Sequence, residues 1–449
     1  MPPSVGPVWP ADRDLPGVRR TIHFAAFAAL ASAAVQGAEP LPEPLTLAAA
    51  LALADDHPAF VHSQATLDSR KADRAAAVAQ TGVRAGIHAR ARLIEPNSHA
   101  RNQSHDDHAL RLRVTKPLLD FGRSQAAVLA ADNEVEGEKW AVLAARQERR
   151  LAITEAFFNV ILADLTFARD DEAMAIAFVR MDRARERNEL GQASDIRLRE
   201  LESIYQDSRR GRFASEARQR LSRAKLATAM NRPGELSEQL IPPALPGVRR
   251  PRPELDVLEK AMLEKNPRLR ALRLRLRAAQ DRVKQARAGD RPLVNGEVEA
   301  AAHTRKTNST DVWRAGVTLE VPLSTGGRTA ARLARRQADV SRQQAELSQA
   351  RLDLSNQVLE AWLALETLTV SQDSSLAFMD YRDLYLDRSR ALYEQEVRAD
   401  LGDAMVQISA ARLRQVQTEF RLAMTWAELD AMTGSTPEEL ERQLVGGER

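Results

Sequence analysis

KPLLDFGR, the sequence at residues 116–123, returns in altered form as VPLSTGGR at residues 321–328. The same separation of 205 residues relates EAFF at 155–158 to EAWL at 360–363. A third pair, DHP at 56–58 and KNP at 265–267, is separated by almost the same number of residues. Internal similarity over this length indicates two copies of one structural unit.

The duplication divides the 449-residue chain into successive segments. Ahead of the first copy, arginines at 19–20 precede an apolar stretch over 22–35 and small residues at 37–38, which is typical of a cleaved signal segment. A buried N-terminal helix is the alternative reading. We expect a signal segment at 1–38, repeat 1 at 39–232, a proline-rich linker at 233–253, repeat 2 at 254–434 and a C-terminal tail at 435–449.

The composition favours long helices over a conventional mixed core. Charged residues make up 28% of the chain and aromatic residues only 4%. The 65 basic and 62 acidic residues are interleaved, so solvated helix faces explain the arginines better than a nucleic-acid-binding stripe does. Because the chain has no cysteine, disulfides and thiolate metal sites are excluded.

Period-two alternation of apolar and polar residues marks four strands. The pattern runs over residues 83–93, resumes at 110 and ends at Pro117, and it recurs at 294–302 and at 313–321, ahead of Pro322. Polar loops separate the members of each pair. Each copy therefore predicts a hairpin with one apolar face and one charged face.

Each predicted hairpin leads into a very long helical region. No proline lies between Pro117 and Pro233, or between Pro322 and Pro437. Residues 123–190 alone would make roughly 100 Å of helix at about 1.5 Å per residue. Helices of this length are stable when they pack as coiled coils, with reversals predicted at Gly191 and near residues 396–400.

Four such strands cannot close a barrel, and an open sheet with an apolar outer face would aggregate. Segments of about 10 residues with this alternation are typical of transmembrane strands. The predicted fold class is α+β and mostly α, with a membrane sheet completed by several chains. A soluble sheet packed on helices is the alternative.

The chain resembles the TolC-type outer-membrane factors between about residues 45 and 434. The resemblance rests on LTL at 45–47, the HP step at 57–58, the two PLxxxGR signatures at 117–123 and 322–328, and NELGQASD at 188–195. It implies a homotrimer in which four strands per chain form one 12-stranded barrel in the outer membrane, continued by a coiled-coil tunnel in the periplasm.

The function that the resemblance implies is that of a passive outer-membrane channel in a tripartite efflux pump, exporting small molecules or metal cations. The implied partners are further copies of the chain, a periplasmic adaptor, an inner-membrane pump and outer-membrane lipid, with no nucleic acid. A type I secretion exit duct and an elongated periplasmic coiled-coil adaptor or scaffold are the alternatives. Two complete hairpin-plus-helix copies argue against the adaptor.

The resemblance also assigns candidate site residues. The barrel–tunnel junction falls at Pro117, Gly122, Arg123, Pro322, Gly327 and Arg328, where a bend favours glycine and the arginines are expected to form hydrogen bonds. The adaptor-contact tip falls at Gly191, Ser194, Asp195 and Glu396, the last of which stands where the family usually has glycine. Helix capping is the simpler explanation of Ser194 and Asp195.

Two further groups have competing explanations. Asp400 and Asp403 are candidates for a periplasmic gate, because threefold symmetry would make carboxylate rings of them, or they simply begin a solvated helix. His99, His105 and His108 have side chains that bind zinc or copper, but a polar surface loop explains them equally well, so no metal site and no cofactor is predicted. Without a phosphate-binding glycine loop, a zinc-binding HExxH helix or a nucleophile elbow, no enzyme is predicted.

Overall fold

The computed structural model describes residues 41–235, 237–306, 310–395, 400–436, 438–439, 442 and 444. The predicted signal segment at 1–38 and the tip residue Glu396 lie outside this range. The elements described below all belong to one compact unit that begins at Pro42.

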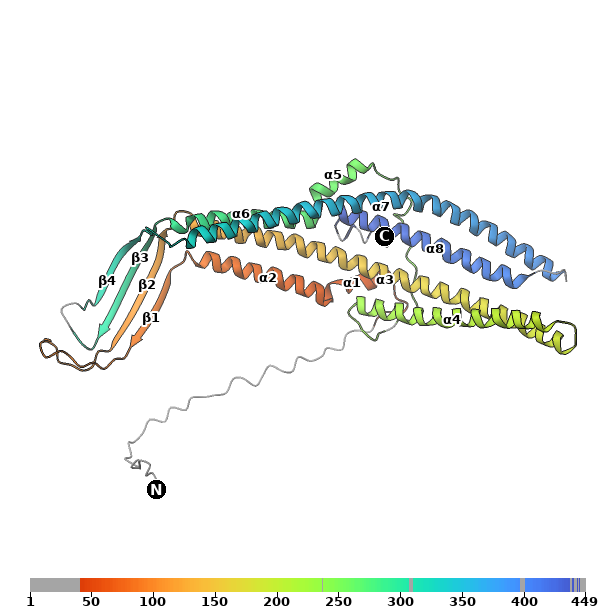
Figure 1. Ribbon diagram of the computed structural model, residues 1–449, viewed down its shortest axis with the longest axis horizontal. Coiled ribbons are helices and arrows are strands. Elements are labelled where there is room, and N and C mark those ends of the chain that lie inside the picture. Colours follow the sequence, from red (N-terminus) through yellow and green to blue (C-terminus); the bar gives the residue numbers. More distant parts are fainter. Residues whose placement is uncertain are drawn as a thin grey trace, which may run out of the picture. The chain divides into compact units, whose positions relative to one another are not determined.

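The two predicted copies have the same order of elements, shown in Figure 1. The first contains α2 (Pro58–Ala79), β1 (Arg84–Arg90), β2 (Ala109–Leu119), α3 (Arg123–Glu189) and α4 (Asp195–Ala229). The second contains α6 (Pro267–Arg287), β3 (Leu293–His303), β4 (Trp313–Glu320), α7 (Arg328–Glu394) and α8 (Leu401–Met432). Short helices α1 (Leu47–Ala52), η1 (Ala54–Asp56), α5 (Leu255–Lys265) and η2 (Ala288–Asp290) complete the described elements. Because α3 and α7 each have 67 residues and start 205 residues apart, the duplication is preserved at the level of single elements.

The four strands form one antiparallel sheet in the order β1-β2-β3-β4. The central β2–β3 pair joins the two copies, with Arg113 opposite Glu299. The prediction that Pro117 ends its strand is wrong, since β2 continues to Leu119. The register shifts between Pro117 and Leu119, and such an irregularity accommodates a residue that has no N–H to donate.

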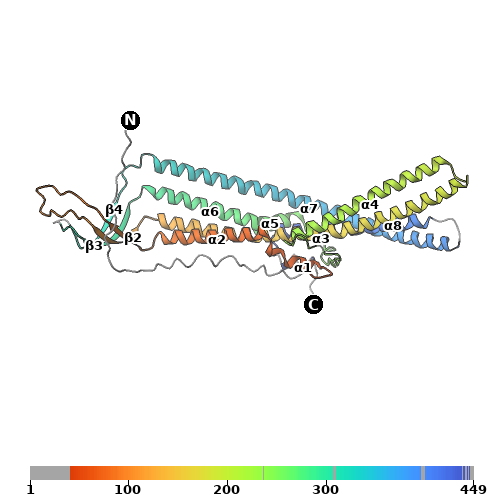
Figure 2. The same ribbon diagram turned by 90° about the horizontal axis from the view of Figure 1, so that it is seen from below.

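The long helices pack side by side, as the two views in Figures 1 and 2 show. Helix α3 contacts α2, α4, α6 and α8, whereas α7 contacts α5, α6 and α8. Helix α7 therefore lies on one edge of the layer and α2 and α4 lie on the other. Large apolar side chains are exposed on both edges, among them Val61 of α2 and Leu352 of α7.

The core between the helices is narrow. Ile153 and Phe157 of α3 are fully buried, and Phe158 stacks on Phe420 of α8 with ring centroids 4.1 Å apart. Among the described helices, only α3 contains an 18-residue window that is long and apolar enough to cross a membrane by length and composition, with a mean hydropathy of 1.6. One third of that window is buried within the chain. Its packing against α8 accounts for part of this apolar character without a membrane span.

Candidate functional site

The first strand-to-helix junction bends sharply at two residues with left-handed backbone. Phe121 has φ 53° and Gly122, which caps α3, has φ 87°. The carboxylate of Asp120 accepts hydrogen bonds from the N–H of Gly122 at 3.2 Å and from the N–H of Ser124 at 2.7 Å. The largest single effect on the pKa of Asp120 is partial burial, which raises it, but the hydrogen bonds from Ser124, Gly122 and Arg123 together outweigh burial and lower it.

The second junction has the same backbone with different residues. Gly326 has φ 57° and Gly327, which caps α7, has φ 80°. The Ser324 hydroxyl accepts a hydrogen bond from the N–H of Gly326 at 3.3 Å. Thr325 donates its hydroxyl to Asp290 at 3.4 Å, which ties this turn to η2.

The predicted junction residues lie at both bends, but the anchors differ from those expected. Arg123 and Arg328 begin α3 and α7, and neither side chain makes a hydrogen bond within the described part of the chain. Instead, Arg291 of the second copy donates to the carbonyl oxygen of Phe121 at 2.8 Å. Sequence reasoning missed Arg291 and Asp120, although the Asx-turn spacing of Asp120 to Gly122 is a recognisable signal.

The first helix tip is a tight turn over residues 190–194. Gly191 has φ 71°, and Ser194 caps α4 by accepting the N–H of Arg197 at 3.3 Å. Asn188 donates to the carboxylate of Asp195 at 2.8 Å. The capping interpretation of Ser194 is therefore correct, while Asp195 lies in the first turn of α4.

Two large apolar side chains are exposed beside this tip. Leu190 is 70% exposed and Ile196 is 83% exposed. Both side chains are therefore available for contact with a partner at this tip. Neither residue is among those that the sequence pattern predicts for the tip.

The second tip is described from Asp400 onward. Asp400 caps α8 by accepting the N–H of Asp403 at 3.0 Å, and it forms an ion pair with Arg180 of α3. The hydrogen bond from Arg180 lowers the pKa of Asp400 and so favours its charged form. Close by, a Cβ atom on Gly402 would lie only 2.9 Å from Ile176, so α8 approaches α3 here at a distance that requires glycine.

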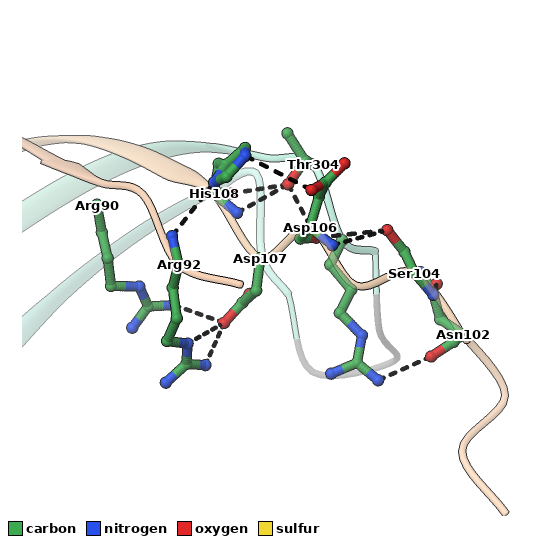
Figure 3. Close-up of polar contacts among 9 residues, drawn as sticks. Arg90, Arg92, Asn102, Ser104, Asp106, Asp107, His108 and Thr304 are labelled. Carbon is green, nitrogen blue, oxygen red and sulfur yellow. Dashed lines mark hydrogen bonds and ion pairs between the residues drawn. The ribbon is translucent and has the colours of Figure 1, made fainter. Parts of the chain in front are cut away.

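One face of the sheet gathers charge. Glu299 of β3 is only 5% exposed at its side chain and lies 2.9 Å from Arg113, 3.1 Å from Arg314 and 3.9 Å from Arg111. At the end of β1 and just past it, Figure 3 shows Arg90 and Arg92 both contacting Asp107. Charged side chains on the predicted charged face therefore interact across β2, β3 and β4. Arg90 of β1 pairs separately with Asp107, just ahead of β2.

The opposite face of the sheet is apolar and open. Its side chains include Ile87 and Trp313, each 71% exposed, Val317 at 67% and Leu319 at 61%. Among the described elements, no helix packs extensively against the sheet. Exposed apolar surface of this extent indicates a face that meets something other than water.

The histidines of the first polar loop have separate partners. The ring of His108 accepts the N–H of Arg92 at 3.2 Å, as Figure 3 shows, while His105 lies 3.4 Å from Glu95 and His99 lies beside Ser98. Across the described part of the chain, no three His, Asp or Glu side chains are grouped so that they could share a metal ion.

Comparison with known proteins identifies the fold. A model of the outer membrane efflux protein family matches residues 258–435, and no curated protein matches. The Campylobacter jejuni CmeC outer membrane channel superposes with a TM-score of 0.72 at 12% identity, over 86% of this chain and 85% of that one. The outer membrane protein VceC of Vibrio cholerae gives 0.68 at 16% identity, over 87% and 96%. The open state of the Neisseria gonorrhoeae MtrE outer membrane channel gives 0.64 at 18% identity, over 87% and 89%. The predicted resemblance and the long-helix fold class are confirmed, although the matching family model covers only the second copy.

Proposed function

The chain has the fold of the TolC-type outer-membrane factors, and from this premise we propose that it is the outer-membrane channel of a tripartite efflux pump. Three copies form one duct, with the sheets in the outer membrane and the helices in the periplasm. The duct passes small molecules or metal cations and performs no chemistry itself. Its energy comes from an inner-membrane pump coupled through a periplasmic adaptor.

The observation that carries this proposal is the contrast between the two faces of the sheet. One face holds the Glu299 cluster and the other holds Ile87, Trp313 and Val317 exposed. A strand that alternates in this way suits a wall between lipid and water. The apolar face then contacts lipid, and the charged face lines an aqueous duct.

The edges of the sheet supply the argument for several copies. Strands β1 and β4 each pair on one side only. Unpaired edge strands are not tolerated within a bilayer, so the sheet must close on itself. Four strands are too few for a barrel, whereas three copies give the twelve that the family resemblance implies.

An exposed apolar stripe on α7, at the edge of the helical layer, offers a contact for the next copy of the chain. Leu352, Leu359, Leu363 and Val370 of α7 are 38–67% exposed and are spaced by seven, four and seven residues. This is coiled-coil spacing on a helix that lies at the edge of the layer. We assign this stripe to the contact between α7 of one copy and α2 or α4 of the next.

The tips are the proposed sites of partner contact and gating. Gly191, Ser194 and Asp195, together with the exposed Leu190 and Ile196, form the surface for the periplasmic adaptor. At the second tip, Asp400 and Asp403 form the proposed gate, where the ion pair from Asp400 to Arg180 holds α8 against α3.

A matched pair of charge substitutions on β4 tests the proposal. Val317 lies on the apolar face and Thr318 on the charged face. A lysine on the lipid face of a membrane barrel costs about 2–4 kcal/mol near the bilayer centre, whereas one on the aqueous face costs little. We expect Val317→Lys to abolish recovery of a detergent-soluble trimer from outer membranes and Thr318→Lys to leave it intact.

Membrane fractionation and the mass of the detergent-purified protein provide the readout. The proposal requires a species with three times the mass of one chain in the outer-membrane fraction. A soluble monomer, or equal recovery of both lysine variants, would refute it.

A further inference from the structure

A cavity of about 790 Å³ lies between α2, α3, α6 and α7, and its walls are rich in arginine. Six guanidinium groups face three carboxylates there, which leaves a net charge of +3. We call this cavity the arginine groove. Its arginines are Arg70, Arg275, Arg282, Arg335, Arg336 and Arg342.

On the α7 wall, one carboxylate serves two arginines. Asp339 lies 3.2 Å from Arg336 and 3.0 Å from Arg342. Arg335, on the same wall, has no ion pair or hydrogen bond from its side chain within the described residues. This wall therefore has more guanidinium donors than its single carboxylate can accept.

The opposite wall repeats the arrangement. Glu134 of α3 pairs with Arg282 and lies 3.8 Å from Arg70. Glu138 pairs with Arg275 at 3.3 Å. Both carboxylates on this wall are already paired with arginines, so neither remains to neutralise Arg335.

Burial decides which charge the groove presents to solvent. The side chains of Glu134, Glu138 and Asp339 are only 10–24% exposed. The five arginines paired with them are 35–66% exposed. The acids thus lie beneath the arginines, and the accessible surface consists mainly of guanidinium groups.

A neighbouring cavity shows that the excess of positive charge is local. About 520 Å³ in volume, it lies further along α3, α6 and α7. Its charged residues are Glu148, Glu346 and Asp353 with Arg268 and Arg275, so acids outnumber bases. The arginine groove is therefore a distinct region rather than part of a uniformly basic face.

From this arrangement we infer that the arginine groove is a binding site for anions that carry phosphate, sulfate or paired carboxylate groups. Guanidinium forks bind such groups through two parallel hydrogen bonds, and partly buried acids hold the forks in place. The inference rests on the proposed function, in which each trimeric duct has three arginine grooves on its helical part. It deepens that function by assigning an anionic class of cargo or regulator to this part of the tunnel.

Calorimetry with inorganic pyrophosphate tests the inference on the purified full-length trimer at low ionic strength. We expect saturable binding that weakens as salt is added. The variant with Arg335→Gln, Arg336→Gln and Arg342→Gln should bind at least about tenfold more weakly, because each lost charged hydrogen bond is worth about one factor of ten. The corresponding triple lysine variant keeps the charge and should retain part of the affinity. Arg388→Gln, an exposed position of α7 outside the groove, should bind like the wild type.

The outcomes separate this inference from the proposed function. An intact trimer that gives no heat with pyrophosphate, or a triple glutamine variant with wild-type affinity, refutes the anion site. Neither result contradicts the proposal that the trimer is a duct. A chain that does not form a membrane trimer refutes the duct itself. Recovery of each variant as a trimer excludes misfolding as the cause of lost binding.

Discussion

The two strand-to-helix junctions reach the same backbone shape by different means. In the second copy, Gly326 and Gly327 both have positive φ, which glycine adopts without a steric penalty. In the first copy, the equivalent positions are Phe121 and Gly122, so one left-handed residue has a bulky side chain. A non-glycine residue in this region costs roughly 1–2 kcal/mol.

Hydrogen bonds around the first junction offset that cost. Asp120 accepts two backbone N–H groups, and Arg291 holds the carbonyl of Phe121. The second junction has a single serine acceptor at 3.3 Å. A bend can therefore be specified by glycine or enforced by neighbouring side chains. The enforced bend depends on the other copy of the repeat, because Arg291 belongs to that copy.

The largest effect is expected where both junctions rely on glycine. No atom lies within 4 Å of a Cβ placed on Gly122 or Gly327, so any cost of substitution comes from the backbone. Gly122→Val and Gly327→Val should each destabilise the protein by about 2–3 kcal/mol, because a β-branched residue at φ near +80° is strongly strained. Thermal unfolding of the detergent-solubilised trimer, followed by helical circular dichroism at matched concentration, measures this. A loss below about 1 kcal/mol at either position would mean that the junction relaxes to another conformation.

The next largest loss of stability should differ between the two junctions. Asp120→Ala removes the acceptor of two backbone N–H groups and should cost about 1.5 kcal/mol, in the range of a lost helix cap. Ser324→Ala removes one longer hydrogen bond and should cost about 0.5 kcal/mol. Equal losses in the same unfolding assay would contradict the distinction between an enforced and a glycine-specified bend.

The contribution of Asp120 should also depend on pH. Its folded-state pKa is lowered, so the ionised carboxylate stabilises the fold above the ordinary value of 3.8, and this stabilisation is lost as pH falls through the lowered pKa. The stability difference between wild type and Asp120→Ala should therefore be constant near neutral pH and shrink in acid. For Ser324→Ala the difference should not change with pH. A difference for Asp120→Ala that grows in acid would show that the ionised carboxylate does not stabilise the fold.

Local patterns and long-range contacts differ in how far the sequence predicts them. Alternation located the four strands to within a few residues, and the absence of proline predicted both 67-residue helices. The hydrogen bond from Arg291 to Phe121 and the ion pair from Arg180 to Asp400 join residues 170 and 220 positions apart. No local pattern encodes such proximity, because it arises only when the two copies pack together. The extension of β2 through Pro117 was missed for a related reason, since the neighbouring strand supplies the irregular register.

A smaller effect tests glycine at the second junction alone. Gly326→Ala should cost about 1 kcal/mol, because φ 57° is unfavourable for alanine and no packing compensates. Gly211→Ala in α4 is the matched control, since its backbone is helical and a Cβ there meets nothing within 4 Å. That control should stabilise the protein by about 0.5–1 kcal/mol. If Gly326→Ala and Gly211→Ala changed the free energy of unfolding in the same direction, backbone conformation would not be the cause of the loss at Gly326.

The smallest expected effect concerns the tips, where the copies are again unequal. The first tip is closed within its own copy by Asn188 and Asp195, whereas Asp400 at the second tip reaches across to Arg180 of the first copy. Both members of this ion pair are about half exposed, so Arg180→Gln should cost at most about 0.5 kcal/mol of global stability. Arg199→Gln, which breaks an exposed pair with Glu202 on a single helix, is the control for losing a surface charge.

The local consequence of Arg180→Gln should be larger than the global one, because this ion pair and the Gly402–Ile176 contact hold the start of α8 against α3. Amide hydrogen exchange in the first turns of α8 should therefore accelerate in Arg180→Gln and stay unchanged in Arg199→Gln. If Asp400 and Asp403 form the periplasmic gate, replacing both with alanine should also raise single-channel conductance or weaken cation block in planar bilayers. Faster exchange without any change in conductance or block would assign Asp400 to anchoring the helix rather than to gating. Unchanged exchange would show that the contact between the two copies does not hold the start of α8. That contact would then not be what distinguishes the second tip from the first.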